Sequence, residues 1–368
     1  MPGQATPARG GGSREPTRGR CVPAGCAALR PAGGTPRTTR RAARTGRGRP
    51  QRQHHHRVPR AGGGVGRVDT VRPTAQRGWT SALAPQGRRP VTRTVDQAQV
   101  VLVTGASSGI GRATALEAAR HGDHVTVLAR SVSELQDLVT ECVAVGAASA
   151  SVAVADVSDD ARVAEVVQLA VARHGHLDAV FHCAGVVTYG RAEEVTPDDF
   201  TAVITTNLLG SAILARHVVR VFREQEHGVL VLVGSLLGHV TVPDMTPYVV
   251  SKWGVRALAK QLALENDDLP HVHIAHVAPG SVDTPIYDNA LDSAGAVNAP
   301  PPPVISPERA ARVVYRQLRS PRAESQTALA NFALIWAHNF VPFAWRRLVG
   351  PVFRAVSHRR PDTEAQKG

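Results

Sequence analysis

The chain has 368 residues, enough for one large α/β domain with a tail or for two ordinary domains. Its formal net charge of +13 would suggest a polyanionic partner, but the charge is concentrated at one end. Residues 1–95 contain 20 Arg, no Lys and two acids, a net charge of +18, so residues 96–368 carry a net charge of −5. The body of the protein is therefore mildly acidic, and we expect no specific nucleic-acid partner for it.

The four cysteines are too few and too scattered for a disulfide framework, which favours a reducing cytoplasm as the compartment. Cys21 and Cys26 have no second pair of Cys or His at the spacing of a zinc site. The run His54–His56 is interpreted as solvated side chains in an Arg-rich segment rather than as weak metal ligands. The sequence therefore predicts no metal site.

Residues 1–95 are rich in Arg, Gly, Pro and Thr and show almost no apolar periodicity. Such a segment cannot bury enough surface to offset its backbone entropy, so it is predicted to be disordered. Met1 is not followed by the apolar core of a secretory signal. An organelle transit peptide, a nucleic-acid-binding arm, a non-essential tail and an upstream start assigned wrongly all remain open as interpretations of this segment.

From residue 100 onward, short Val-rich runs alternate with longer helical patterns. The apolar runs predict strands at Val100–Val103, His124–Ala129, Ser151–Ala155, Asp178–His182, Val229–Gly234 and Val272–Val277. The segments between them predict helices at 112–120, 132–145, 161–174, 198–224 and 247–265. Apolar strands that alternate with long helices indicate an α/β fold: a Rossmann-type, doubly wound parallel sheet with helices on both faces.

The C-terminal third begins with an irregular connection over 283–306, which includes the proline cluster Ala299–Pro303. A helix is predicted to start at Pro307 with Ser306 as its cap, and residues 327–356 hold most of the Trp and Phe of the chain. We therefore divide the chain into a disordered tail (1–95), a Rossmann-fold domain (96–322) and an aromatic, amphipathic C-terminal extension (323–368).

The turn after the first strand reads Thr104-Gly105-Ala106-Ser107-Ser108-Gly109-Ile110-Gly111. Glycines in this position let the backbone approach a pyrophosphate and turn sharply into a helix whose N-terminus attracts the anion. The spacing is Gly-x3-Gly-x-Gly, which differs from the commoner Gly-x-Gly-x-x-Gly pattern. Its place between a strand and a helix favours a dinucleotide-binding turn.

Arg130 follows the second strand, where sites for NAD usually place an acid that holds the ribose hydroxyls. No acid occurs here before Glu134. A guanidinium at this point is suited to a 2′-phosphate, which it can bind through two hydrogen bonds, so the sequence favours NADP(H) over NAD(H).

Tyr248 and Lys252 are four residues apart early in a predicted helix, so their side chains share one face. A nearby ammonium stabilises a phenolate and lowers the pKa of the tyrosine, which suits it to acid–base catalysis. Ser235 lies at a strand end and is placed to hydrogen-bond both a substrate oxygen and the phenol.

Taken together these segments resemble the short-chain dehydrogenase/reductase superfamily. The resemblance covers about 99–320 and rests on Thr104-Gly105-x3-Gly109-x-Gly111, Asp156, Asn207, Ser235, Tyr248-x3-Lys252 and Pro279-Gly280. It implies an enzyme that interconverts a carbonyl (ketone or aldehyde) and an alcohol with NADP(H).

The resemblance also implies roles for individual residues. Tyr248 would protonate the carbonyl oxygen, Ser235 would orient the carbonyl, and Lys252 would hold the nicotinamide ribose. Asn207 would anchor a water that links Lys252 to solvent, and Asp156 would contact the adenine. The implied cofactor contacts are Thr104, Gly105, Ser107, Ser108, Gly109, Ile110, Gly111, Arg130, Asp156, Val157, Ala184, Gly185, Tyr248, Lys252, Pro279, Gly280, Val282 and Thr284.

One residue departs from the family pattern, because Cys183-Ala184-Gly185 stands where Asn-Ala-Gly is usual. The asparagine mainly ties the sheet together, so Cys183 is expected to weaken a structural contact more than catalysis. We favour a small buried residue here over a reactive thiol.

A nucleotide-binding regulatory protein without turnover is the alternative function, and the intact set of four catalytic side chains argues against it. Residues 329–337 are apolar but too short to span a bilayer, and Arg346 and Arg347 follow them. An interfacial helix, a cover over the substrate pocket and a dimer surface all remain open for this segment. We expect a cytoplasmic homo-oligomer that takes a small, hydrophobic substrate, with weak peripheral membrane contact as the alternative.

Overall fold

The computed structural model describes residues 97–288, 290–292 and 300–357. The tail predicted to be disordered (1–95) lies outside this range, together with Cys21, Cys26 and His54–His56. Side chains of 291–292 and 356–357 are likewise not described.

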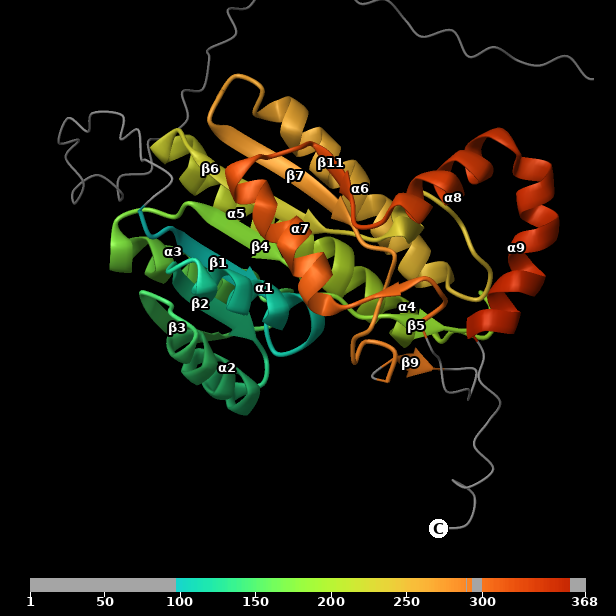
Figure 1. The fold of residues 1–368 in the computed structure, drawn as a ribbon, viewed down its shortest axis with the longest axis horizontal. Helices are drawn as coiled ribbons and strands as arrows, with labels where there is room; N and C mark the ends of the chain where they lie inside the picture. Colours follow the sequence, from blue (N-terminus) through green and yellow to red (C-terminus); the bar gives the residue numbers. More distant parts are fainter. Residues whose placement is uncertain (1–96, 289, 293–299, 358–368) are drawn as a thin grey trace, which may run out of the picture. The chain divides into compact units, whose positions relative to one another are not determined.

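Seven parallel strands form one sheet in the order β11-β7-β6-β4-β1-β2-β3 (Figure 1). The strands are β1 (Val100–Thr104), β2 (His124–Ala129), β3 (Ser149–Val154), β4 (Ala179–His182), β6 (Gly228–Val233), β7 (Val272–Ala278) and β11 (Glu324–Gln326). Both faces of this sheet are covered, which explains why its central strands are continuous runs of Val and Leu. The predicted doubly wound α/β architecture is confirmed.

Helices pack on both faces of the sheet. They are α1 (Gly109–Arg120), α2 (Val132–Ala144), α3 (Asp160–His174), α4 (Pro197–Ile204), α5 (Gly210–Gln225), α6 (Thr246–Glu265), α7 (Pro307–Arg319), α8 (Leu329–Phe340) and α9 (Pro342–Ser357). One core cluster joins the sheet to α3, α5 and α6, and the other joins it to α1, α2 and α7. The strand order reverses between β1 and β4, so the connections that leave their carboxyl ends run to opposite faces of the sheet, and a crevice is expected between them.

Two elements differ from what the sequence predicts. The helix expected over 198–224 is interrupted by η1 (Thr205–Leu209), a π-helical turn between α4 and α5. The edge strand β11 was not expected, because its residues Glu-Ser-Gln carry no apolar pattern; it pairs in parallel with β7. Four two-residue strands were not expected either: β5 (Thr188–Tyr189), β8 (Ser281–Val282), β9 (Leu291–Asp292) and β10 (Val304–Ile305).

The start of α7 is as predicted: the Ser306 hydroxyl accepts a hydrogen bond from the backbone N–H of Arg309, and Pro307 opens the helix. Within the described part of the chain, one helical run (Pro197–Gln225) is long and apolar enough to cross a membrane by length and composition. Its α5 portion buries Leu214, Val218 and Phe222 in the core against the sheet, as a core helix does. This run is therefore weak support for a membrane span.

The central strand β6 offers a direct test of the core. Leu230 is fully buried in it, so Leu230→Ala should lower the free energy of unfolding by about 2–5 kcal/mol. The matched control is Leu264→Ala at the end of α6, where the side chain is 74% exposed, and it should change stability by no more than about 0.5 kcal/mol. Chemical denaturation of both variants gives the comparison, and equal losses would contradict this assignment of the core.

Candidate active site

The glycine-rich turn between β1 and α1 is shaped by contacts that exclude side chains. Gly105 has φ +64°, and a Cβ on it would lie 2.6 Å from the backbone of Ala184. A Cβ on Gly111 would lie 2.2 Å from the carbonyl oxygen of Gly105. Only glycine fits at both positions, so the turn can close tightly and present the N-terminus of α1 to the crevice.

A cavity of about 590 Å³ opens over this turn at the carboxyl ends of the strands. Of the residues predicted to contact a cofactor, those that line it are Gly105, Ser107, Ser108, Gly109, Ile110, Gly111, Arg130, Asp156, Val157, Ala184, Gly185 and Thr284. The sequence missed other lining residues, namely Leu128, Ala129, Ser131, Glu134, Ala155, Cys183, Val186, Thr206 and Ile286. Most of these follow a strand end, a signal that marks the place but not the individual side chain.

The predicted contacts that lie outside this cavity wall are Thr104, Tyr248, Lys252, Pro279, Gly280 and Val282. Thr104 is buried, and its hydroxyl lies 2.7 Å from Nδ1 of His182 inside the sheet. Val282 packs in a small core cluster with Ile305, and the carbonyl of Pro279 accepts the N–H of Leu236. Thr104, Pro279 and Val282 therefore have structural partners, and a cofactor role for all of these residues remains a prediction.

The far end of the cavity is basic at its surface. The Arg130 side chain is 75% exposed, and its nearest carboxylate oxygen, from Asp156, lies 3.9 Å away. Burial opposes the charge of Asp156, but hydrogen bonds from the side chain and backbone of Ser158 outweigh it, so the pKa of Asp156 is lowered. The Arg130 guanidinium is thus left open toward solvent and the cavity.

Ser235, Tyr248 and Lys252 converge, although they come from different elements. Ser235 caps the 3-10 turn η2 (Leu236–Gly238) that follows β6, and its hydroxyl accepts the N–H of Leu237 at 3.1 Å. The phenol of Tyr248 hydrogen-bonds Ser235, and Lys252 Nζ lies 5.6 Å from the centre of the Tyr248 ring. The helical spacing of four residues therefore brings the ammonium beside the tyrosine, as the sequence indicated.

Burial sets the protonation of this group. Lys252 is 5% exposed, and its ammonium donates to the carbonyl of Val233 at 3.2 Å. Because burial disfavours its charged form, the pKa of Lys252 falls to about 8. Burial also raises the pKa of Tyr248, only partly offset by the hydrogen bond from Ser235. The sequence predicted a lowered pKa for Tyr248; in the structure the desolvation of the phenolate outweighs the hydrogen bond from Ser235 and raises that pKa.

Asn207 lies in the π-helical turn η1 and ties three segments together. Its amide oxygen accepts the N–H of Val186 at 2.8 Å, and its amide nitrogen donates to the Val186 carbonyl at 2.9 Å. The same nitrogen donates to the hydroxyl of Ser251 on α6 at 2.9 Å. The side chain thus joins the loop after β4 to the helix that carries Tyr248, and its predicted role as a water anchor remains a prediction.

Cys183 replaces the asparagine expected after β4. The thiol is half-buried at the wall of the cavity, and burial raises its pKa to about 12, so it is neutral and a weak nucleophile at physiological pH. The backbone N–H of Cys183 still donates to the carbonyl of Thr104 at 3.2 Å, which keeps β4 joined to β1. These observations favour a structural residue over a reactive thiol.

Tyr248 and Ser235 line a second cavity, of about 230 Å³. Its lining is mostly apolar and comes from Val187, Tyr189, Ser235, Leu236, Leu237, Val240, Val242, Met245, Tyr248, Gly280, Ser281, Ile286, Tyr287, Pro301, Pro302, Pro303, Ala330, Asn331, Leu334, Trp345, Val349, Val352 and Phe353. Ile286 lines both cavities, so the two adjoin there. Apart from Ser235, Tyr248 and Gly280, sequence reasoning named none of these residues as site residues.

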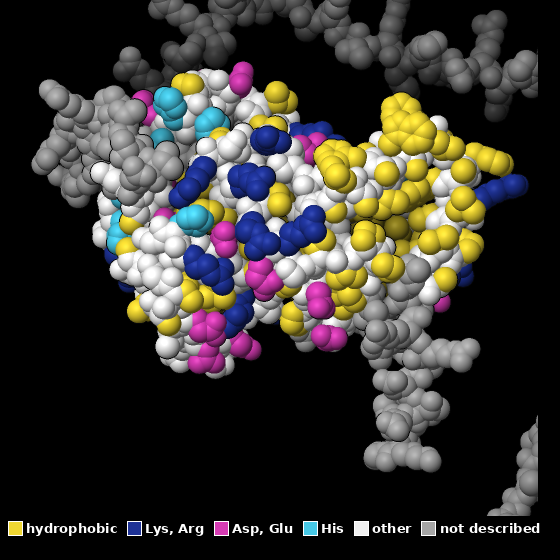
Figure 2. Space-filling model, viewed as in Figure 1, with side chains coloured by type: hydrophobic (Ala, Val, Ile, Leu, Met, Phe, Trp, Pro, Cys, Tyr) yellow, Lys and Arg dark blue, Asp and Glu magenta, His cyan; other side chains and the backbone are white. Residues whose placement is uncertain are grey.

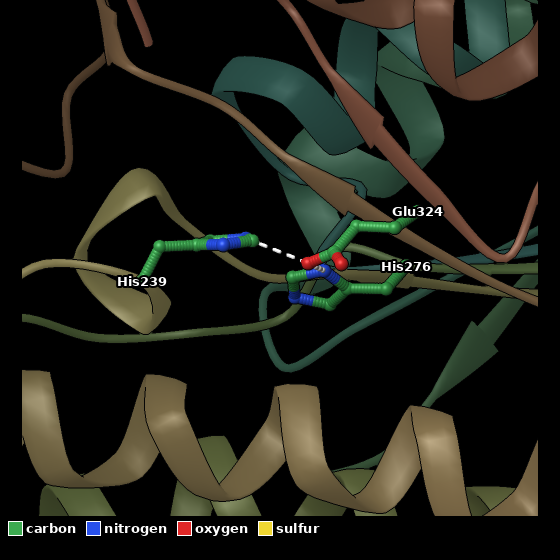
Figure 3. Close-up of side chains that lie close together, drawn as sticks. All are labelled: His239, His276 and Glu324. Atoms are coloured by element: carbon green, nitrogen blue, oxygen red, sulfur yellow. Dashed lines mark ion pairs between the residues drawn. The ribbon is translucent and has the colours of Figure 1, made fainter. Parts of the chain in front are cut away.

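Near this site, three potential metal ligands lie together: His239, His276 and Glu324, whose ligand atoms are within 4.8 Å of one another (Figure 3). His239 Nε2 is 2.8 Å from Glu324 Oε1, whereas His276 Nδ1 is 3.7 Å away, too far for a hydrogen bond. Arg256 donates to the same Oε1 at 2.7 Å, and Lys260 lies 3.6 Å from Oε2. Because Arg256 and Lys260 already balance the charge of the Glu324 carboxylate, we interpret the cluster as an ion-pair network rather than a metal centre.

The site therefore defines a nucleotide-binding α/β protein with a buried Tyr–Lys–Ser group between two cavities. The model for the short chain dehydrogenase family matches residues 99–294, and the chain belongs to this family. Members of the family generally use a nicotinamide cofactor and act on small molecules as oxidoreductases.

The chain is also similar to individual reductases. It is 33% identical to the sepiapterin reductase of Chlorobaculum tepidum over 215 residues, which are 56% of this chain and 87% of that protein. It is 34% identical to the levodione reductase of Leifsonia aquatica over 205 residues, 55% of this chain and 75% of that protein. It is 32% identical to the 3-dehydrosphinganine reductase of Danio rerio over 189 residues, 50% of this chain and 57% of that protein.

The lowered pKa of Lys252 can be measured directly, because the chain has only three lysines, Lys252, Lys260 and Lys367. In an NMR titration of 13Cε-labelled lysine, one signal should titrate at about pH 8. Below pH 8 the ammonium is charged, and above it the amine is neutral. The neighbouring His182 and Cys183 have pKa values of about 3 and about 12, so neither titrates in this window.

The assignment follows from Lys252→Arg, which should remove the signal that titrates at low pH, whereas Lys260→Arg should leave it. The absence of a lysine signal that titrates near pH 8 would contradict the lowered pKa of Lys252.

Proposed function

We propose that the protein is an NADP(H)-dependent oxidoreductase that reduces a hydrophobic ketone or aldehyde to an alcohol. The observation that carries this proposal is the position of Tyr248 and Ser235. Both line the apolar cavity, and that cavity adjoins the glycine-turn cavity at Ile286. A carbonyl compound in the apolar cavity would face a group held in the glycine-turn cavity.

The cavity over the glycine turn fits a dinucleotide. Gly105 and Gly111 leave no room for a Cβ, Ser107 and Ser108 precede the start of α1, and Ala184 and Gly185 form the opposite wall. The turn and the helix N-terminus would hold the pyrophosphate, and Asp156 would contact the adenine. The bound nicotinamide supplies the hydride that the carbonyl carbon receives.

The protein's own groups supply the proton and the orientation. Because burial raises its pKa, Tyr248 carries its proton at neutral pH and can donate it to the carbonyl oxygen as that oxygen gains charge. Ser235 is placed to hydrogen-bond the same oxygen and so fixes its direction. Lys252 keeps a positive charge below about pH 8, which would stabilise the phenolate that remains and bind the ribose.

Arg130 supports the choice of NADP(H). Its guanidinium is exposed at the cavity, 3.9 Å from the nearest carboxylate oxygen, and is free to bind a 2′-phosphate. Glu134 also lines the cavity, but it lies on α2 and not at the end of β2. The acid expected of an NAD site is therefore absent from its usual position.

The names of the relatives support reduction as the direction of the reaction, since all three are named as reductases. The apolar lining of the cavity beside Tyr248 supports a hydrophobic substrate. A protein that only bound nucleotide would have no use for this convergence of Ser235, Tyr248 and Lys252. We further propose a cytoplasmic homo-oligomer, a state common in the family, which analytical ultracentrifugation would test.

The role of Tyr248 is tested by Tyr248→Phe, which removes one hydroxyl and little surface. NADPH-dependent reduction of a carbonyl substrate, found by screening a panel of ketones and aldehydes for loss of NADPH absorbance, should fall about 10²–10⁴-fold. NADPH affinity, measured by fluorescence, should stay within about twofold and serves as the folding control. Turnover retained in this variant would mean that the proton comes from another group.

The role of Arg130 is tested by Arg130→Asp, which should weaken NADPH binding more than tenfold, because a hydrogen bond to a charged group contributes about 1.5–3 kcal/mol. NADH affinity should not fall, since NADH lacks the 2′-phosphate. Arg191→Asp is the matched control, because Arg191 is exposed and lines neither cavity. Equal affinities of the unmodified protein for NADH and NADPH would refute the assignment.

A further inference from the structure

The C-terminal helices α8 and α9 expose an apolar face, which we call the hairpin face. Figure 2 shows hydrophobic side chains crowded over the part of the molecule where Figure 1 places these helices. The residues of the hairpin face are Leu329, Phe332, Trp336 and Phe340 of α8 and Phe343, Leu348 and Val352 of α9. Phe340 and Phe343 are 71% and 70% exposed, which is unusual for two neighbouring phenylalanines.

This exposure does not result from poor packing of the helices. On α8 the exposed residues 329, 332, 336 and 340 follow helical spacing and form one stripe, while Asn331 on the other side is buried and donates to the carbonyl of Ala278 at 3.2 Å. On α9, Trp345 donates to the carbonyl of Thr241 at 3.0 Å and Arg354 pairs with Asp244 at 2.9 Å. The inner sides of both helices thus contact the rest of the domain, and the apolar stripe on their outer side stays exposed.

The hairpin face is basic as well as apolar. Residues 329–357 contain no Asp or Glu, whereas Arg346 and Arg347 are both exposed. The Arg347 guanidinium lies over the Phe343 ring, 4.6 Å from its centre. Neither Arg346 nor Arg347 has a carboxylate within ion-pair distance in the described part of the chain. Aromatic rings beside unpaired arginines fit the boundary between headgroups and acyl chains of an anionic bilayer.

A second copy of the chain fits this face less well. In a two-fold symmetric dimer the face would meet itself, so Arg346 and Arg347 would approach the same residues of the copy with no acid in the face to neutralise them. The helices are also too short to span a bilayer, which requires about 20 apolar residues, and α8 has 12. We propose that the hairpin face docks on the surface of an anionic membrane, with α8 and α9 lying along it.

The apolar cavity connects this docking to substrate supply, a step that rests on the proposed function. Leu334 and Val352 line the cavity, yet they are 38% and 57% exposed at the surface. Docking through the hairpin face would place this wall of the cavity against the acyl chains. The substrate class that follows is a carbonyl compound dissolved in the membrane, such as a long-chain ketone, rather than a water-soluble one.

The test is fluorescence quenching by lipid, because Trp336 lies in the hairpin face. The full chain is mixed with phosphatidylcholine–phosphatidylglycerol vesicles whose acyl chains carry bromine, which quenches only tryptophans that reach the chains. We expect quenching in the unmodified protein, most of which is lost in Trp336→Phe. It should be kept in Trp253→Phe, the matched control, since Trp253 lies on α6. Bromine on the acyl chains does not report attraction between lipid headgroups and residues 1–95, with a net charge of +18, but Trp79 lies in that segment, so every variant is made in a Trp79→Phe background.

Two further variants separate the contributions. Phe340→Ser with Phe343→Ser should reduce partitioning onto these vesicles more than tenfold, and Arg346→Gln with Arg347→Gln should reduce it on the order of tenfold on anionic vesicles only. The control pair Leu169→Ser with Leu264→Ser, exposed on α3 and α6, should leave partitioning unchanged. NADPH affinity is measured on each variant. Unchanged affinity shows that the variant is folded, and NADPH binding itself tests the proposed function independently of membrane docking.

Two outcomes would overturn the proposal. Vesicle binding without quenching of Trp336 would mean that another segment binds the lipid. Absence of binding, combined with a smaller oligomer for Phe340→Ser with Phe343→Ser in sedimentation, would assign the hairpin face to contact between copies of the chain.

Discussion

The burial of the Lys252 ammonium is the constraint on which the group Ser235, Tyr248 and Lys252 depends. Lys252 is almost wholly buried, and the carbonyl of Val233 accepts one hydrogen bond from its ammonium. Burial lowers the pKa of Lys252 and raises that of Tyr248, so the charged form of each is disfavoured. Tyr248 therefore keeps its proton and can donate it. The Tyr248 phenolate is poorly stabilised as a proton acceptor until an additional partner stabilises the charge of Lys252 beside it. The hydroxyls of a bound ribose are partners of the right kind.

The fold supplies this site in two halves. β1 and β2 bring the glycine turn and Arg130 to one cavity, whose walls come mostly from residues before 207. The helix α6 contributes Tyr248 to the other cavity, whose walls come largely from residues after 280. Under the proposed function, this arrangement would separate the recognition of the cofactor from the recognition of the substrate. Changes in α8 and α9 can alter the substrate without disturbing the part that holds the dinucleotide.

The parts that the sequence predicted are those with a local cause. Buried parallel strands must be apolar throughout, so their Val-rich runs were visible. Gly111 is required by its contact with Gly105 in the same turn, and the glycine spacing was visible for that reason, although the contact that excludes a Cβ at Gly105 comes from the distant Ala184. Tyr248 and Lys252 share a face because of helical spacing alone. In contrast, β11 is polar and exists because it pairs with β7, and the lining of the apolar cavity depends on helices far along the chain. The net direction of the Tyr248 pKa shift likewise depends on burial, which no local pattern reveals.

Glu324 shows how one such long-range residue joins the halves of the site. It lies on the edge strand β11, just before α8, and Arg256 of the catalytic helix donates to it at 2.7 Å. His239, at the end of the turn that Ser235 begins, contacts the same oxygen at 2.8 Å. Burial opposes the charge of Glu324, but these partners outweigh it and hold its pKa far below the usual range, so the carboxylate stays charged. The helix of Tyr248, the turn of Ser235 and the root of the hairpin face are therefore fixed to one anion.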